Sequence, residues 1–403
     1  MMSNKAPFLA ALPVMQQLSD HGYQAYFVGG AVRDYLMQRP INDIDMTTSA
    51  TPDEVEALFD HTIPIGKEHG TINVVWQGDN YEITTFRTEG AYIDHRRPSE
   101  VSFVRDLYLD VERRDFTINA IAMDHQFQIL DYFNGQQDIQ AKVIRTVSNP
   151  HARFEEDALR ILRGLRFQSQ LGFSIDSETY IAMTDLASDI SHLAIERIMV
   201  ELEKLLKGQY VAETFSSLSD LHIWDYLPYF KALPMDRIHV TAPLTLPQFL
   251  AIVMTYDIQG VSMKQLKRSN DEIRHAEKLC QAIKQLPNVS TKSAYRQFVY
   301  DFGKLLCLEL LDMQSLLQAN DITQVSPLVF NMQTVEDTWQ SLEITSRKQL
   351  AIDGKILMQA FNKKAGPWLK DALRRAECAV VQQNIPNDEQ EIIEWVKANV
   401  KIP

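Results

Sequence analysis

Two aspartates placed two positions apart, shortly after a Gly-Gly pair, constrain the fold of this chain more than any other feature. The aspartates stand in Asp43-Ile44-Asp45, and the glycines are Gly29 and Gly30. On a β-strand both carboxylates point to one face, while Ile44 points into the core. Adjacent carboxylates repel each other unless a cation lies between them, and their oxygens suit a hard divalent cation. The sequence therefore predicts a strand that holds such an ion, with Mg²⁺ as the expected metal.

The glycine pair predicts a backbone that approaches a ligand closely. Gly29 and Gly30 carry no side chain, and the helix expected after them offers free N–H groups to a phosphate. A Gly-Gly pair alone is often only a tight bend, and an Asp-x-Asp pair alone is more often a solvated turn or a helix cap. Their order and spacing together favour a metal-dependent nucleotidyl transfer site.

Glu82 is the candidate for a third acidic residue of this site. It lies in residues 81–86, where alternation predicts a strand with Tyr81, Ile83 and Thr85 on the face opposite Glu82. An exposed strand glutamate is the alternative interpretation. This strand and residues 72–76 are expected to form a hairpin joined at residues 78–80.

The bulk composition is typical of a soluble globular protein with two to four domains. The chain has 403 residues, of which 45% are hydrophobic and 23% charged. Its cysteines, Cys280, Cys307 and Cys378, have no zinc-binding spacing and fit a reducing compartment. Because the sequence shows no signal-peptide pattern and no apolar run that would cross a bilayer, we expect a cytoplasmic protein without a membrane partner.

The charge is acidic overall but basic in one stretch. A net charge of −13 argues against a non-specific nucleic-acid binder. Residues 87–166 nevertheless carry eleven arginines: Arg87, Arg96, Arg97, Arg105, Arg113, Arg114, Arg145, Arg153, Arg160, Arg163 and Arg166. An acidic protein with a basic cleft still attracts a polyanion, so the charge leaves RNA binding open.

The pattern along the chain predicts an α+β head followed by an all-helical part. Helix 7–21 and strand 24–28 come first, and Thr51-Pro52-x-Glu54 is a strong helix start. Past about residue 150 the strand signals fade and helices dominate. We therefore expect a mixed, largely antiparallel sheet in the head.

Two arginines and an aspartate occur together in Arg113-Arg114-Asp115-Phe116-Thr117-Ile118-Asn119-Ala120. The preceding residues 107–110 are strand-like, and the string is expected to open a helix. A salt-bridged helix start is the plain interpretation. The functional one, which the long and unusual string favours, has an arginine on triphosphate oxygens and the acid on a ribose hydroxyl. The polar residues 87–104 before it predict a mobile loop, either a surface excursion or a lid.

A second motif contains the Asn134-Gly135 pair, which is a hairpin-turn signal. It lies in Asp131-Tyr132-Phe133-Asn134-Gly135-Gln136-Gln137-Asp138. A structural turn and a direct role at the site are equally good interpretations of this motif.

Residues 153–166 have helical periodicity with a polar stripe of Asp157, Arg160, Arg163 and Arg166. Salt bridges on a solvated face are the plain interpretation. A more specific interpretation starts from the hydrogen-bonding groups on the edges of the nucleotide bases. Cytosine and adenine present an amine donor beside a ring-nitrogen acceptor, which Asp157 and Arg160 complement. Uracil and guanine present the opposite groups and would leave both contacts unpaired. One helical turn would then select C and A, while Arg163 and Arg166 stack, orient or reach phosphate.

An amphipathic helix is predicted at residues 195–207, before Gly208. Its apolar stripe indicates a packing helix of the scaffold. Nothing after Gly208 indicates catalysis.

The motifs GGxxRD with DxD, RRDFTINA, DxxNGxxD and EDxxRxxR, in this order, resemble those of class II tRNA nucleotidyltransferases, the CCA-adding enzymes. They cover residues 20–210 or so, and the helical remainder is similar in length to that of the bacterial forms without an HD domain. One departure is Asn134, which stands where a glycine is common in the family.

The resemblance implies template-independent addition of C, C and A to the 3′ end of tRNA, with CTP, ATP and Mg²⁺. It implies that Asp43 and Asp45 hold the metal and that Glu82, in the segment that follows DxD in the family, assists them. Gly30 and Arg33 would contact phosphates, and Arg114 would lie in the ribose–triphosphate motif. Asp157, Arg160, Arg163 and Arg166 would form the nucleotide-binding helix, in agreement with the base-edge argument.

The same resemblance implies a catalytic head (1–150), a neck that recognises the base (151–210), a body (211–290) and a tRNA-binding tail (291–403). A homodimer is suggested by the resemblance alone.

Three other functions stay open at this point. Poly(A) polymerases share the head but usually carry a basic C-terminal extension, unlike this acidic chain. Enzymes that add only CC or only A are disfavoured by the full-length segment 87–104. A non-catalytic RNA-binding protein is disfavoured by the intact Asp43, Asp45, Glu82 and Arg114.

Overall fold

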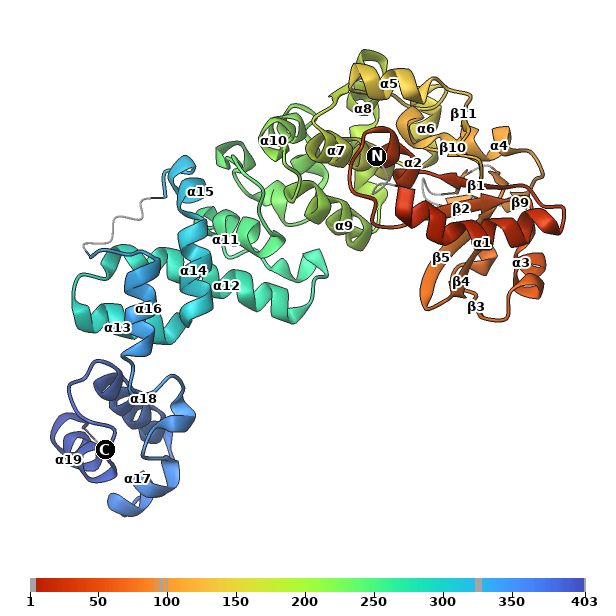
Figure 1. Cartoon of the computed structure of the whole chain (residues 1–403). Coiled ribbons are helices and arrows are strands. Elements are labelled where there is room, and N and C mark those ends of the chain that lie inside the picture. Colours follow the sequence, from red (N-terminus) through yellow and green to blue (C-terminus); the bar gives the residue numbers. More distant parts are fainter. Residues whose placement is uncertain (1–4, 91, 94–96, 99–100, 323–327, 402–403) are drawn as a thin grey trace. The chain divides into compact units, whose positions relative to one another are not determined.

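The computed structural model describes residues 5–90, 92–93, 97–98, 101–322 and 328–401 (Figure 1). The chain divides into two compact units. The first is Met1–Met235 with Lys264–Lys267, and the second is Asp236–Met263 with Arg268–Pro403.

The first unit is built around a seven-stranded sheet in the order β11-β10-β1-β2-β5-β4-β3. Only β2 and β5 pair in parallel, and the other neighbours are antiparallel. This confirms the mixed, largely antiparallel sheet. The strands are β1 (Ala25–Val28), β2 (Asp45–Thr48), β3 (Thr62–Ile63), β4 (Thr71–Trp76), β5 (Asp79–Thr85), β10 (Ile121–Met123) and β11 (Ile129–Asp131).

The two faces of this sheet have different roles. One face carries Phe27, Met46 and Ile83, and it packs under the helices α1 (Ala6–Asp20), α2 (Gly30–Leu36) and α3 (Pro52–Leu58) (Figure 1). Alternate residues point to the other face, which is partly covered by α4 (Leu107–Glu112). Because side chains alternate along a strand, the polar residues of β2 and β5 lie together on this second face.

The predicted start of α3 is confirmed, whereas the predicted turn of the β4–β5 hairpin is displaced. Thr51 and Glu54 form the predicted capping box, with Pro52 as the first helical residue. The hairpin turn is Gln77-Gly78, where both residues have positive φ. Asp79 and Asn80 already belong to β5, so the predicted joint at 78–80 was displaced by about one residue.

Two other local predictions were wrong. Residues 107–110 are not strand-like but lie in α4, because Asp106 caps that helix and Leu107 and Val111 supply its buried stripe. The Asn-Gly pair does not make a hairpin: Asn134 adopts the left-handed conformation and Gly135 begins helix α5 (Gly135–Ala141). The carboxylate of Asp131 accepts hydrogen bonds from the first backbone amides of α5, including that of Gly135 at 2.8 Å.

The segment 87–104 is more regular than predicted where it is described. Strand β6 (Arg87–Glu89) pairs with β9 (Val101–Phe103), and β7 (Tyr92–Ile93) pairs with β8 (Arg97–Pro98). Residues 91, 94–96 and 99–100 of the predicted lid lie outside the described residues.

The helices that follow the head do not include the single helix predicted at 153–166. The chain leaves the helical conformation at Asp157, with φ −149° and ψ 101°. A short parallel pair, β12 (Val143–Ile144) with β13 (Ser174–Ile175), was not predicted either. The helices of this region are α6 (Pro150–Glu156), α7 (Leu159–Leu171), α8 (Ser177–Leu186), α9 (Ile195–Leu206) and α10 (Val211–Asp220).

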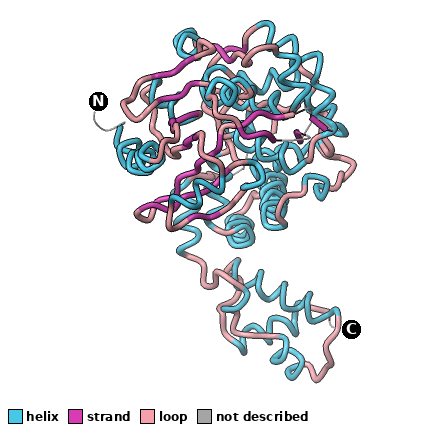
Figure 2. Tube along the Cα trace, turned by 90° about the vertical axis from the view of Figure 1, so that its right-hand side faces the viewer, coloured by secondary structure: helices cyan, strands magenta, loops and turns pink. Residues whose placement is uncertain are grey.

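The described residues of the second unit form helices and loops and no strand. Figure 2 shows this alternation of helices and loops in the part that carries the C-terminus. The helices of the second unit are α11 (Leu246–Tyr256), α12 (Asn270–Gln285), α13 (Lys292–Phe302), α14 (Lys304–Asp312), α15 (Gln314–Ala319), α16 (Met332–Gln340), α17 (Gly354–Ala360), α18 (Pro367–Val381) and α19 (Glu389–Asn399). A separate apolar cluster that includes Leu357, Val380 and Val396 joins α17, α18 and α19. This confirms the predicted helical remainder.

Short 3₁₀ helices connect many of these elements. They are η2 (Lys67–His69), η3 (Thr117–Asn119), η4 (Ala187–His192), η5 (Ile223–Tyr226), η6 (Phe230–Ala232), η7 (Met235–Arg237), η8 (Met263–Leu266), η9 (Leu286–Asn288) and η10 (Arg347–Gln349). Within the part of the chain that the structure describes, none of the helices combines the length and apolarity needed to cross a membrane.

Gly135→Ala tests the packing of α5 against η3. A Cβ at this position would lie 2.2 Å from the carbonyl oxygen of Thr117 and 2.8 Å from Ile121. Because the first contact is backbone, we expect the free energy of unfolding to fall by about 1–3 kcal/mol or more. Urea denaturation measures the loss, and Gln137→Ala on the exposed side of α5 serves as the control. Equal stability of the two variants would contradict this packing.

Candidate active site

A cavity of about 1110 Å³ lies in the first unit, over the polar face of the sheet. Its walls come from β2 and β5, from the segment after α4, and from α7 and α9. All ten residues predicted for the site line it: Gly30, Arg33, Asp43, Asp45, Glu82, Arg114, Asp157, Arg160, Arg163 and Arg166. Residues far apart in the sequence are thus gathered in one place, while their chemical roles stay predictions.

Three carboxylates meet where β2 begins, on the two central strands β2 and β5 and the residues just before β2. Asp45 is the first residue of β2 and lies directly opposite Glu82 in the parallel β2–β5 register. Asp43 precedes the strand, so the expectation that both aspartates belong to it was wrong for Asp43. The expected alternation still holds, because Ile44 is buried while Asp43 and Asp45 line the cavity.

The acidic side chains oppose one another's ionisation. Removal from water raises the pKa of Asp45, Arg114 acts against this, and Asp43 adds to it, leaving the pKa above its ordinary value. The pKa of Glu82 is raised in the same way, first by removal from water and then by Asp45 and Asp43. Arg114 therefore does not fully offset the negative charge of these acidic side chains, which a cation would balance. Among the described residues, however, no three acidic, histidine or cysteine side chains are arranged to hold a metal by themselves.

The turn at Gly29 and Gly30 places backbone beside Asp45 and Arg114. Gly29 has φ +70°, in the left-handed region that favours glycine. A Cβ there would lie 3.5 Å from Nη1 of Arg114 and 3.9 Å from Oδ2 of Asp45. The turn, the arginine and the aspartate are therefore packed against one another.

A chain of hydrogen bonds connects α2 to α7 across the cavity. Arg33 donates to Oδ1 of Asn119 at 2.7 Å, and Nδ2 of Asn119 donates to Asp115 at 3.2 Å. Nε of Arg163 donates to the other oxygen of Asp115 at 2.7 Å. Burial alone would raise the pKa of Asp115, but Arg163, Arg160 and Asn119 lower it to about 2. Asn119 thus fixes two arginines of the cavity, a role that its position in the sequence did not reveal.

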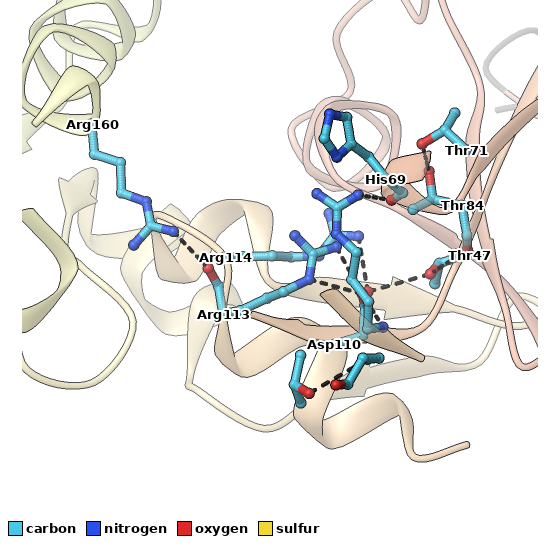
Figure 3. Close-up of polar contacts among 11 residues, drawn as sticks. Thr47, His69, Thr71, Thr84, Asp110, Arg113, Arg114 and Arg160 are labelled. Atoms are coloured by element: carbon cyan, nitrogen blue, oxygen red, sulfur yellow. Dashed lines mark hydrogen bonds and ion pairs between the residues drawn. The ribbon is translucent and has the colours of Figure 1, made fainter. Parts of the chain in front are cut away.

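Arg113 and Arg114 follow α4 instead of opening a helix, which corrects the sequence prediction. Both pair with the buried Asp110 (Figure 3). The arginine motif is therefore attached to the head by the end of one helix and by the carboxylate that this helix carries.

Asp157 and Arg160 already have partners within the protein. The carboxylate of Asp157 accepts from the backbone amide of Leu159 and forms an ion pair of 2.7 Å with Arg197. Arg160 donates to the carbonyl oxygens of Arg153 and Arg113 and pairs with Glu156 at 2.6 Å. Figure 3 shows Arg160 reaching towards Arg113.

Helix α9 contributes more than the predicted scaffold. Arg197 and Lys204 line the cavity, and the buried Glu201 pairs with Arg166 at 2.9 Å. Arg166 also lies over the ring of Phe167, 4.2 Å from its centre. Arg197, Glu201 and Lys204 follow one another at intervals of four and three residues, so they share one face of the helix. This spacing of polar residues in the sequence was the signal that could have placed them at the cavity.

Comparisons with known proteins agree along the whole chain. Residues 25–145 match the family model of the poly A polymerase head domain. Residues 172–233 match "Probable RNA and SrmB- binding site of polymerase A", and residues 248–396 match tRNA nucleotidyltransferase domain 2.

Two curated relatives and one solved structure are similar over nearly their full lengths. The CCA-adding enzyme of Staphylococcus epidermidis is 51% identical over 98% of this chain and 99% of its own. That of Staphylococcus aureus is 50% identical over 99% and 100%. The crystal structure of the Bacillus stearothermophilus CCA-adding enzyme in complex with CTP has a TM-score of 0.83 and 35% identity, covering 97% of both chains.

Asp45→Asn tests whether the ionised carboxylate of Asp45 destabilises the folded protein. Because the folded-state pKa of Asp45 is raised, its ionised form costs stability above that pKa and costs nothing once the pH falls below the ordinary value. In metal-free buffer at pH 7 we expect the variant to melt at a higher temperature than the unaltered protein, and the difference to vanish near pH 3. The exposed Asp60→Asn is the control. A lower melting temperature for Asp45→Asn at pH 7 would show that the ion pairing of Asp45 with Arg114 dominates.

Proposed function

The chain belongs to the CCA-adding enzymes, and we propose that it completes the 3′ end of tRNA by adding C, C and A in turn. CTP and ATP supply the nucleotides, and no nucleic-acid template is used. The observation that carries the proposal is the single cavity that gathers the acidic pair, the arginine motif and the residues for base recognition. Full-length similarity to curated CCA-adding enzymes supports it.

Enzymes of this family use a divalent metal ion, and Mg²⁺ is the ion proposed for this chain. Asp43 and Asp45 would hold it, with Glu82 beside them. Mg²⁺ is usually bound through one or two carboxylates together with substrate phosphates and water, so a site completed by the nucleotide fits these residues. The raised pKa values of Asp45 and Glu82 agree with such a site, because a cation would relieve their mutual repulsion. When bound, the ion lowers the pKa of the attacking hydroxyl and neutralises developing charge.

The remaining residues position the reactants. Gly30 offers close backbone approach, and Arg33 and Arg114 bind the triphosphate. The tRNA 3′ oxygen attacks the α-phosphorus in line, a new O–P bond forms, and pyrophosphate leaves. Arg163 and Arg166 orient the nucleotide or reach its phosphates. The carboxylates that pair with these arginines keep them in place before the nucleotide arrives.

Base selection rests on Asp157 and Arg160. The aspartate accepts the amine hydrogen of cytosine or adenine, and the arginine donates to the adjacent ring nitrogen. Both side chains are engaged in the present structure, Asp157 with Arg197 and Arg160 with Glu156. A base therefore binds by exchanging some of these contacts, and uracil or guanine would leave both groups unpaired.

The proposed division of labour keeps the boundaries of the sequence analysis. Residues 1–150 catalyse, 151–210 read the base, 211–290 form a body and 291–403 bind tRNA. A cytoplasmic location and a homodimer are further proposals, which rest on the family alone.

Extension of a tRNA that lacks its CCA end tests the function. With Mg²⁺ and CTP we expect two additions, and with CTP plus ATP we expect three, resolved on a sequencing gel. Asp43→Ala should lose all addition, with a rate decrease of at least about 10³-fold, because charge stabilisation at the metal is lost. Its tRNA binding should be retained in a gel-shift control.

Other products would contradict the proposal and indicate a different activity. A long ladder with ATP alone would indicate a poly(A) polymerase. A stop after CC, or addition of A only to a tRNA that already ends in CC, would indicate a partial enzyme. Turnover by Asp43→Ala would contradict the assignment of the metal site.

Arg160→Ala tests base selection. Removing the donor should lower the ratio of kcat/KM for CTP to that for UTP by at least about tenfold, because the paired site no longer rejects the wrong edge. Lys207→Ala, which removes an exposed cation outside the cavity, is the control and should keep the ratio. Because Arg160 also bonds to backbone, both variants are compared by thermal unfolding. Unchanged selectivity in a folded Arg160→Ala protein would refute the base-edge argument.

A further inference from the structure

Asp110 is a buried carboxylate for which the function proposed above gives no role. It lies on α4, its exposed fraction is 0%, and it does not line the cavity. An ionised carboxylate is stable in such a place only when charged and polar groups surround it. Its partners therefore indicate what it is placed there to hold.

Donors from three separate parts of the head converge on Asp110 (Figure 3). Arg113 donates to Oδ1 through Nε at 3.2 Å and Nη2 at 2.8 Å, and Arg114 donates to Oδ2 through Nη2 at 3.3 Å. The hydroxyl of Thr47, which also lies 3.0 Å from the carbonyl oxygen of Thr84, is 3.3 Å from Oδ2, and the backbone amide of Arg87 is 3.4 Å from Oδ1. Burial alone would raise the pKa of Asp110, but the two guanidinium groups outweigh it and keep the carboxylate ionised.

Arg114 lines the cavity, and Asp110 holds one edge of its guanidinium. Its Nη2 is bound by Asp110, while its Nη1 lies at the Gly29 turn, 3.5 Å from where a Cβ on Gly29 would be. Its Nε is buried and has no hydrogen-bond partner among the described residues. A guanidinium fixed in this way keeps donors available for an anionic ligand.

Asp110 also ties these arginines to the strand of the catalytic carboxylates. Thr47 is two residues after Asp45 on β2, so both side chains lie on the same face of the sheet. One buried carboxylate thus sets the arginine motif against the strand that carries Asp45. A long, flexible arginine would otherwise sample many rotamers, and binding would have to order it.

We propose that Asp110 is a positioning residue, which holds Arg114 in the orientation that binds the nucleotide triphosphate beside Asp45. The proposal rests on the proposed function, in which Arg114 binds the triphosphate. Asp110 itself touches neither nucleotide nor metal. Its effect is therefore expected on recognition of the phosphates and not on the choice of base.

The test compares CTP with CMP, which has the same base and sugar but a single phosphate. Dissociation constants for both are measured by calorimetry at one fixed Mg²⁺ concentration. Asp110→Asn keeps the shape of the side chain but turns one charged acceptor into an amide donor. We expect the preference for CTP over CMP to fall about tenfold or more, which corresponds to the loss of a charge-assisted hydrogen bond. The ratio of CTP to ATP binding should stay unchanged.

Asp138→Asn is the matched control. Asp138 is also buried in the head, accepts a hydrogen bond from Thr117 at 2.7 Å and pairs with Arg145, but it does not line the cavity. Its variant should lose stability and keep the preference for CTP over CMP. The double variant Asp110→Asn with Arg114→Ala should bind CTP no more weakly than Arg114→Ala alone, because Asp110 acts through Arg114.

The outcomes separate this inference from the proposed function. If the unaltered protein does not prefer CTP over CMP, the proposed function fails. If it does, and Asp110→Asn keeps the same preference, the positioning role is overturned while the function stands. If Asp110→Asn does not fold, Arg114→Lys decides: lysine keeps the charge but cannot bridge Asp110 and a phosphate with a rigid fork. A preference for CTP like that of the unaltered protein would then overturn the role, and a loss would support it.

Discussion

The mutual repulsion of Asp43, Asp45 and Glu82 is the constraint on which the rest of the site depends. The parallel register of β2 and β5 fixes Asp45 opposite Glu82. Removal from water is the largest cause of the raised pKa values of both residues, and the negative charge of their acidic neighbours adds to it. In the proposed nucleotidyl transfer site, this arrangement keeps acidic oxygens ready for a cation before it arrives.

Three arginines that line the cavity each form an ion pair with a separate carboxylate. Arg114 pairs with Asp110, Arg163 with Asp115, and Arg166 with Glu201, and in every pair the carboxylate is buried. Such a pair neutralises the arginine within the protein and holds its guanidinium in one orientation. Nine arginine and lysine side chains and five acidic side chains line the cavity, so it keeps an excess of positive charge in spite of these pairs. This explains how a chain with a net charge of −13 builds a place for a polyanion.

The sequence predicted residues that lie on strand edges and in long motifs, and it failed where distant contacts decide. Alternation around Ile44 and along residues 81–86 was enough to place these acidic residues, since a strand carries that information in neighbouring residues. Periodicity in steps of three could not show that the helix breaks at Asp157, whose carboxylate pairs with Arg197, 40 positions away. Asn119 accepts a hydrogen bond from Arg33, which is 86 positions away, and no local pattern encodes such a link.

The engagement of Asp157 by Arg197 bears on how the proposed base recognition gains its selectivity. A base that displaces Arg197 must give Asp157 a donor in return, because a half-buried carboxylate that loses its partner costs about 1 kcal/mol or more. The amine of cytosine or adenine makes that exchange nearly even, whereas the carbonyl of uracil or guanine offers an acceptor to an acceptor. Each base therefore has to replace the contact that Arg197 makes with Asp157. Selectivity then comes less from the strength of the correct contact than from the cost of giving up Arg197 for the wrong one.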